Sequence, residues 1–149
     1  MPAKALIDNG SQKCLISKDF SERLGLPTQI VKHRIFGVNN TIAESSTYEV
    51  NLTFTPYFND EFFNSVALIV NKATTNLPNF TFSYHSWPHL EGLQLADPTF
   101  YKSSSIDLLI GADLFAEILE GQSILGPKGS PSAINSKLGW LFWNYLFTR

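Results

Sequence analysis

The sequence predicts an all-β fold, a small barrel or folded sheet with two short helices. Apolar and polar side chains alternate over residues 48–55, which is typical of a strand with one buried face. Short apolar runs are separated by Gly, Asn and Pro, as they are between strands. Helical spacing is found over residues 17–24 and 113–119, and each stretch is only about two turns long.

The first predicted elements are a buried strand, a tight turn and a helix. The apolar run at residues 5–7 stops at the turn-forming residues 8–11. An apolar pair at 15–16 leads to Ser17, whose hydroxyl suits a helix N-cap. Gly25 stands where a C-terminal capping glycine belongs, so we expect this helix to end at Leu24.

A hairpin and a strand pair are predicted next. Residues 34–38 form a strand that ends in a turn, and a polar stretch then leads to the alternating strand. Residues 62–70 are expected to pair with that strand through the connection 56–61. Residues 71–105 are rich in Asn, Ser, Thr and Pro, and we expect an irregular segment. Its predicted apolar anchors are Phe80, Phe82, Tyr84, Trp87, Leu90 and Leu93.

The C-terminal part begins with a second buried strand. Residues 106–110 are apolar and end at Gly111, and a helix over 113–119 is expected to end at Gly121. Three short segments, 123–125, 132–134 and 137–142, complete the chain.

Composition limits the class of protein. The chain has 149 residues, about one domain, and its 44% hydrophobic content excludes a disordered chain. With a net charge of −2, the chain lacks the excess of positive charge that is typical of nucleic-acid-binding proteins. The single cysteine, Cys14, cannot form an internal disulfide and fits a reducing compartment. With no apolar run of about 18–20 residues and no signal segment, we expect a cytoplasmic protein without a membrane partner.

Two features that occur together indicate chemistry. An apolar strand ends in Asp8-x-Gly10, and about a hundred residues later a second apolar strand ends in Gly111 and leads into a helix. In this combination the chain resembles the retropepsin-like aspartic proteases. The closest likeness is to the protease domain of Pao/BEL-type retrotransposon polyproteins. The similar stretches are ALIDNGSQ (5–12), IS (16–17) with RLGLP (23–27), WPHL (87–90) with LAD (95–97), IDLLIGAD (106–113), and GP (126–127) with LGW (138–140).

The resemblance implies a retropepsin-like acid protease barrel over residues 1–149 as a single domain, with a truncated N-terminal strand and a divergent tail at 142–149. In the family, the Asp-Ser/Thr-Gly loop carries the catalytic carboxylate, and the later strand and helix brace that loop. A hairpin between the catalytic loop and the next strand closes over the substrate. The implied residues are Asp8 as the catalytic residue, Asn9, Gly10, Ser11 and Gly111 as loop support, and Gly37, Val38, Asn39 and Asn40 as the flap.

Peptide hydrolysis without a metal needs one group that deprotonates water and another that protonates the carbonyl or the leaving amine. Two carboxylates that share one proton do both, as in the aspartic proteases that are the standard example. The chain offers one Asp-x-Gly loop, so the implied enzyme is a homodimer with one Asp8 from each copy. It would cut its own polyprotein, with no cofactor, no metal and no nucleic-acid partner for this domain.

An alternative function is a catalytically inactive remnant that acts at most as a peptide-binding or dimerisation domain. Asn9 stands where the family has Ser or Thr, and only seven residues precede Asp8, where relatives have a further strand. Activity and inactivity therefore both remain open on the sequence.

Other polar residues have a structural interpretation. His85 and His89 are four apart, but Pro88 between them breaks the helix that would place both on one face of a metal site. Cys14 is expected to be a buried, unreactive thiol. Three further carboxylates are expected to be caps or surface charges: Asp97, Asp107 and Asp113.

Overall fold

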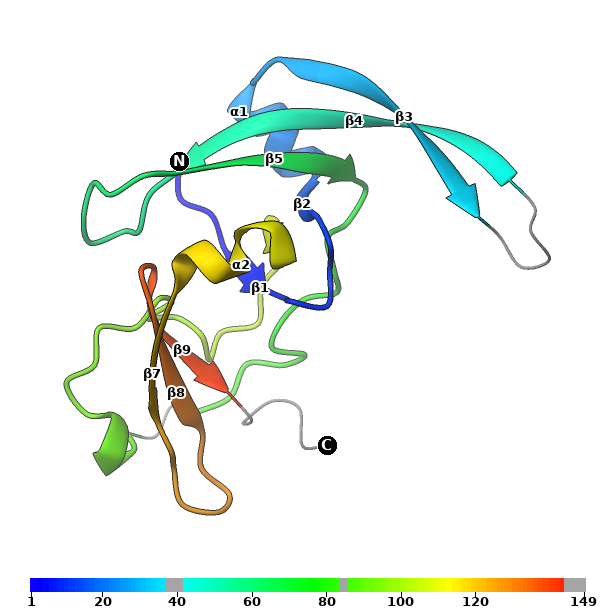
Figure 1. Ribbon diagram of the computed structural model, residues 1–149. Coiled ribbons are helices and arrows are strands. Elements are labelled where there is room, and N and C mark those ends of the chain that lie inside the picture. The colour runs from blue at the N-terminus through cyan, green and yellow to red at the C-terminus, as the bar shows by residue number, and fades with distance from the viewer. Residues whose placement is uncertain (37–41, 84–85, 144–149) are drawn as a thin grey trace.

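The fold is built from two open β-sheets and two short helices (Figure 1). The structure is a computed structural model, and it describes residues 1–36, 42–83 and 86–143. The larger sheet has the strand order β1-β6-β2-β5-β4-β3, and the smaller has the order β7-β8-β9. The strands of the larger sheet are β1 (Ala5–Ile7), β2 (Cys14–Ser17), β3 (Thr28–Phe36), β4 (Ile42–Phe54), β5 (Phe63–Val70) and β6 (Leu108–Ile110). The smaller sheet contains β7 (Leu119–Ile124), β8 (Ser132–Ser136) and β9 (Gly139–Trp143).

The predicted β-rich class is confirmed, but the expected closed barrel is not formed by the described strands. β1 and β3 are the two edges of the larger sheet, and four strands lie between them. A barrel closes only when its first and last strands pair, and here these edges have different partners. β1 pairs with β6 alone, and β3 pairs with β4 alone, among the described strands.

β6 lies between the two strands that flank the Asp-x-Gly loop. It runs parallel to β1, with Ile110 opposite Ile7, and antiparallel to β2, with Leu108 opposite Ile16. β2 then pairs in parallel with β5, which continues the sheet toward β4. A strand from late in the chain therefore joins two strands that are close neighbours in sequence.

The core lies where both helices, α1 (Lys18–Leu24) and α2 (Ala112–Ile118), pack against the larger sheet. Burial of one large apolar side chain, such as Leu, Ile or Phe, contributes about 1.5–3 kcal/mol to the stability of the fold. The buried cluster consists of Cys14, Ile16, Phe20, Val50, Leu52, Phe63, Ala67, Leu108, Ile110, Leu114 and Ile118.

Helix α1 has the ends that its sequence predicts. The Ser17 hydroxyl accepts a hydrogen bond from the Phe20 N–H at 3.3 Å, and Gly25 closes the helix in the left-handed conformation, with φ 65°. The Gly25 N–H donates to the carbonyls of Ser21 and Glu22, which satisfies two groups that a helix end leaves open.

Helix α2 ends earlier than expected, and the prediction that Gly121 ends it is wrong. The helix stops at Ile118, and Leu119 is already extended, with φ −70° and ψ 138°. Gly121 has φ 81° and lies inside β7, where the pairing with β8 is irregular between Leu119 and Ser123. A left-handed residue is typical of a β-bulge, so this glycine belongs to the strand.

The β3–β4 hairpin is longer than predicted. Its pairing runs from Thr28 opposite Val50 to Phe36 opposite Ile42, so the polar stretch before residue 47 is itself a strand. Of β4, residues 49–54 also pair with β5, whereas residues 42–48 pair with β3 alone among the described strands. The free end of the hairpin accordingly extends beyond the rest of the sheet (Figure 1).

The segment 71–105 is largely irregular, as predicted, with one short 3-10 helix, η2 (Pro88–Leu90). Leu90 is a buried anchor, but Phe80 is 60% exposed, so its predicted role as an anchor is wrong. Tyr84 lies outside the described residues. The predicted anchor Trp87 packs edge-on against Phe142 of β9 with centroids 5.9 Å apart, and Phe100, which was not predicted, packs edge-on against the same ring at 4.7 Å. The tail expected to diverge from residue 142 therefore begins inside a strand, and residues 144–149 lie outside the described part.

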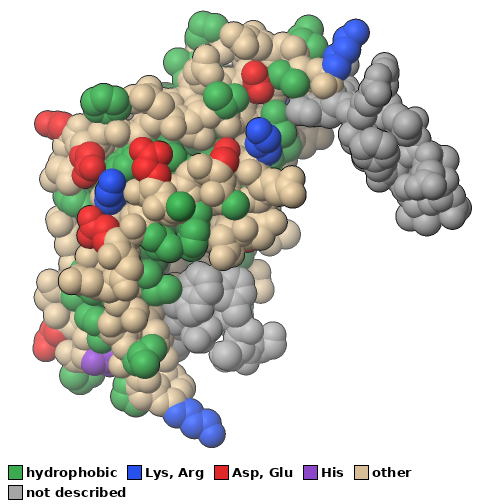
Figure 2. All heavy atoms as spheres, viewed as in Figure 1, with side chains coloured by type: hydrophobic (Ala, Val, Ile, Leu, Met, Phe, Trp, Pro, Cys, Tyr) green, Lys and Arg blue, Asp and Glu red, His purple; other side chains and the backbone are tan. Residues whose placement is uncertain are grey.

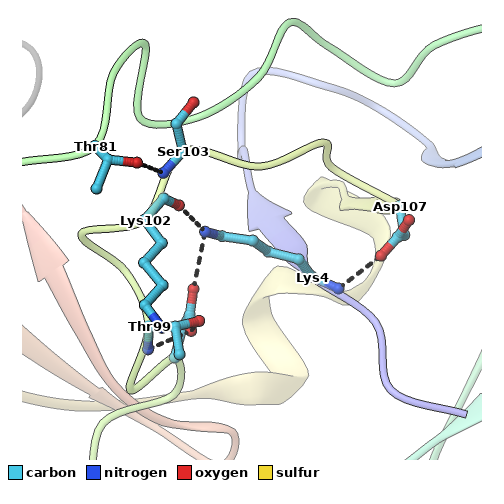
Figure 3. Close-up of polar contacts among 7 residues, drawn as sticks. Lys4, Thr81, Thr99, Lys102, Ser103 and Asp107 are labelled. Atoms are coloured by element: carbon cyan, nitrogen blue, oxygen red, sulfur yellow. Dashed lines mark hydrogen bonds and ion pairs between the residues drawn. The ribbon is translucent and has the colours of Figure 1, made fainter.

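Polar contacts of Lys4 tie the same segment to the start of β1 (Figure 3). The Lys4 Nζ donates to the Lys102 carbonyl at 2.9 Å and lies 3.4 Å from the Asp97 carboxylate. The Lys4 main-chain N–H donates to Asp107 Oδ2 at 2.9 Å. Lys4 thus joins the irregular segment, β1 and the residue that leads into β6.

In the part of the chain that the structure describes, no helix is both long and apolar enough to cross a membrane.

Candidate active site

Asp8 follows directly on β1 at one end of the larger sheet. Its main-chain N–H donates to the Ile110 carbonyl at 2.9 Å, which extends the pairing of β1 with β6 by one residue. Its side chain is exposed, and Oδ1 accepts the N–H of Gly10 at 2.9 Å. A Cβ at Gly10 would lie 3.1 Å from Oδ1, so a glycine lets the turn stay this close to the carboxylate. The turn therefore fixes the orientation of an exposed carboxylate.

The loop returns to β2 by crossing over Gly111. A Cβ on Gly111 would lie 2.5 Å from the Lys13 carbonyl oxygen and 2.8 Å from that of Ser11, both of them backbone atoms. The backbone of Gly111 has φ −92°, so the requirement for glycine here is space and not conformation. Next to it, the Ala112 N–H donates to the Ser11 carbonyl at 2.7 Å. The predicted site residues Asp8, Gly10, Ser11 and Gly111 are thus brought together.

Two further residues complete the loop. The Ser11 N–H donates to the Asp8 carbonyl at 3.2 Å, and its hydroxyl donates to the Lys13 carbonyl at 2.8 Å. Asn9 is exposed between them. Because it is exposed, the Asn9 side chain is accessible to solvent or to another molecule.

Cys14 is a neutral, buried thiol, in agreement with the sequence-based expectation that it is buried. It is 1% exposed, accepts the Gly111 N–H at 3.4 Å and donates to Asp113 Oδ1 at 3.2 Å. Burial raises the pKa of the thiol, and the contact with Asp113 raises it further, against the lowering effect of Ser65 and the Gly111 N–H. Sequence reasoning missed this contact, because nothing in the sequence pairs two residues 99 positions apart.

The predicted flap residues, Gly37, Val38, Asn39 and Asn40, lie outside the described residues. The strands that flank them, β3 and β4, pair as far as Phe36 and Ile42. On this ribbon Ile30 and Tyr48 are cross-strand partners, and both side chains are more than half exposed, at 64% and 52%.

The other carboxylates have structural contacts, as predicted. Asp97 and Asp107 bind Lys4, and Asp107 also lies 3.4 Å from the Arg23 guanidinium. His89 Nε2 is 2.9 Å from the Pro131 carbonyl, whereas His85 lies outside the described residues. Within residues 1–36, 42–83 and 86–143, no group of three or more His, Cys, Asp or Glu side chains could hold a metal ion.

A hollow of about 220 Å³ lies between the β4–β5 connection and the smaller sheet. Glu61, Glu120, Lys137 and Trp140 line it, and no residue of the Asp8 loop does. On the face drawn in Figure 2, lysine and arginine side chains stand singly among patches of hydrophobic ones. The described atoms of that face thus form no continuous basic stripe.

Asp8 is the carboxylate of this loop, so hydrolysis by a pair of carboxylates would require a second acidic group from outside the loop. Comparison with protein-family models, curated proteins and solved structures finds no match to the chain. A proposal for the function therefore rests on the geometry of the Asp8 loop and on the resemblance of the sequence motifs.

Proposed function

We propose that the chain is a retropepsin-like aspartic endopeptidase that hydrolyses peptide bonds as a homodimer. The observation that carries the proposal is the support of the Asp8 loop. β6 lies between β1 and β2, and the loop crosses Gly111 in backbone contact. This is the brace that the resemblance implies, and it is formed by residues that are remote in sequence.

The proposed chemistry needs two copies of Asp8 on a two-fold axis. When two carboxylates lie within hydrogen-bond distance, they cannot both ionise, so they share one proton. The ionised member takes a proton from water, and the protonated member donates to the carbonyl oxygen of the substrate. The exposed position of Asp8 supports this arrangement, because a buried carboxylate could not meet its counterpart across an isologous interface.

The proposed substrate is an extended peptide of a retrotransposon polyprotein. The resemblance to the Pao/BEL type supports it, and so does the β3–β4 hairpin, which extends beyond the sheet as a closing flap requires. The proposed setting is reducing and cytoplasmic, because the single cysteine, Cys14, fits a reducing compartment.

A second candidate function is an inactive remnant that binds peptide or dimerises without cleavage. Asn9 favours it, because in the family a Ser or Thr hydroxyl at this position forms a hydrogen bond across the dimer and braces the two loops. Asparagine can also donate and accept, but it is larger and has a different shape.

Peptide-library cleavage over a protein concentration series, from about pH 4 to about pH 7, tests the proposal. We expect cleavage that rises faster than linearly with concentration and that disappears in Asp8→Asn. Asp60→Asn, which removes another exposed aspartate far from the loop in sequence, is the matched control and should cleave like the wild type. Cleavage that survives Asp8→Asn would overturn the proposed mechanism. A protein that cleaves nothing at any concentration, whether it is monomeric or dimeric in sedimentation, would overturn the proposed function in favour of the inactive alternative.

A further inference from the structure

Three consecutive residues at the start of α2 bind the returning end of the Asp8 loop. The Gly111 N–H donates to Cys14 Sγ at 3.4 Å, and the Ala112 N–H donates to the Ser11 carbonyl at 2.7 Å. Asp113 Oδ1 accepts a hydrogen bond from Cys14 Sγ at 3.2 Å. We call residues 111–113 the bracket, because they hold the chain from Ser11 to Cys14 against the end of β6.

The thiol of Cys14 links two members of the bracket through one atom. It accepts from Gly111 and donates to Asp113, and it is almost completely buried. A buried N–H that loses its acceptor costs stability, so the Gly111 N–H needs a partner at this point. Asp113 Oδ1 accepts the hydrogen bond of the thiol S–H, and this orients the sulfur lone pairs toward the Gly111 N–H.

The position of Gly111 determines the position of the loop. A Cβ at this position would lie less than 3 Å from the carbonyl oxygens of Lys13 and Ser11, so the loop leaves no space for a side chain. A displacement of Gly111 therefore also changes the path of the backbone that leads to Asp8. Two such loops must meet within hydrogen-bond distance, and an error of about 1 Å in a catalytic group can cost roughly a hundredfold in rate.

We infer that Asp113 is a positioning residue, which fixes the Asp8 loop through the thiol of Cys14. Its effect on cleavage rests on the proposed function, whereas its effect on the loop does not. A merely structural role would act through charge, because the helix dipole favours a negative group in the first turn. Asparagine separates the two roles, because it has no charge but keeps the Oδ1 acceptor.

The experiment measures hydrogen exchange of the Ala112 amide and the kinetics of peptide cleavage in four variants. In Asp113→Ala and Cys14→Ala, we expect the Ala112 amide to exchange roughly tenfold faster and kcat to fall with little change in KM. Asp113→Asn is expected to behave like the wild type in both measurements. Glu117→Ala, which removes another exposed carboxylate from α2, is the matched control and should leave the Ala112 amide unchanged.

Two results would overturn the inference. The first is an Ala112 amide that exchanges at the wild-type rate in Asp113→Ala, because the bracket would then not depend on the carboxylate. The second is equal loss in Asp113→Asn and Asp113→Ala, which would assign the effect to helix charge. If the wild type shows no Asp8-dependent cleavage, the proposed function fails, but the exchange rates still decide the role of Asp113.

Discussion

Gly25 and Gly111 are glycines for different physical reasons, and only one of these reasons can be found locally. Gly25 adopts φ 65° at the end of α1, and its place after a short helical pattern predicts this. Gly111 has an ordinary φ, and it is a glycine because the backbone of residues 11–13 lies against it. Position along the chain therefore predicts the first, whereas the second depends on a contact between distant residues.

Substituting these glycines tests the difference. Gly111→Ala must push backbone aside, and we expect a loss of about 2–3 kcal/mol in the free energy of unfolding, together with loss of any Asp8-dependent cleavage. Gly25→Ala meets no atom within 4 Å and is strained by its φ alone, so we expect about 1 kcal/mol and unchanged cleavage. Urea unfolding and the peptide assay measure both effects. Equal behaviour of the two variants would contradict a steric role for Gly111.

The Asp8 site itself was only partly predictable from single residues. That Asp8, Gly10 and Gly111 lie together could be predicted because a short motif and a later apolar-Gly strand occur in the order of a known family. The partnership of Cys14 with Asp113 was not found, because each residue alone has an ordinary explanation as a buried thiol or a first-turn charge. Their proximity follows from the insertion of β6 beside β2, which no local pattern encodes.

Among the elements, α1 was predicted within its true bounds because both of its ends are determined by neighbouring residues. Ser17 supplies the N-cap and Gly25 the C-terminal cap. The end of α2 was misplaced because a glycine three residues later satisfied the same rule, although that glycine lies inside β7, where the pairing with β8 is irregular. The β3–β4 hairpin was predicted too short because the stretch before Thr47 is polar and lacks apolar alternation in sequence, although its backbone pairs with β3.

The N-cap of α1 gives a test at this scale. Ser17→Ala removes the acceptor of the Phe20 N–H, and we expect a loss of about 1 kcal/mol in the free energy of unfolding. Ser17→Thr keeps a hydroxyl and should recover most of that loss. Circular dichroism during urea unfolding measures the difference. A stable Ser17→Ala would show that packing of Phe20 alone holds the helix.

For the whole molecule, the class of fold was predictable and the strand order was not. Alternation and short apolar runs identify strands because each strand has its own pattern of burial. Which strands become neighbours depends on contacts such as Ile7 with Ile110, and the decision between an open sheet and a barrel depends on the two edges. These are properties of the assembled chain, so the described strands form open sheets where a barrel or folded sheet was predicted, although most of the strands were predicted.

The contacts of Lys4 predict how the irregular segment responds to proteases. Lys4→Met keeps the length of the side chain but removes its bonds to Lys102 and Asp97, and we expect faster cleavage by added protease within residues 97–105. Lys18→Met is the control, because its ion pair with Glu22 is exposed and contributes little. Limited proteolysis followed by mass spectrometry locates the cuts. An unchanged cleavage pattern in Lys4→Met would show that the aromatic contacts of Phe100 are sufficient.

The placement of β6 between β1 and β2 also determines when, during translation, the site can form. A ribosome makes Asp8 long before Gly111, and at about 5–20 residues per second the intervening chain takes roughly 5–20 s to synthesise. Until then β1 lacks its hydrogen-bonded neighbour, and the loop has nothing to cross. The loop that carries Asp8 therefore acquires its support only after the chain has been synthesised beyond residue 111.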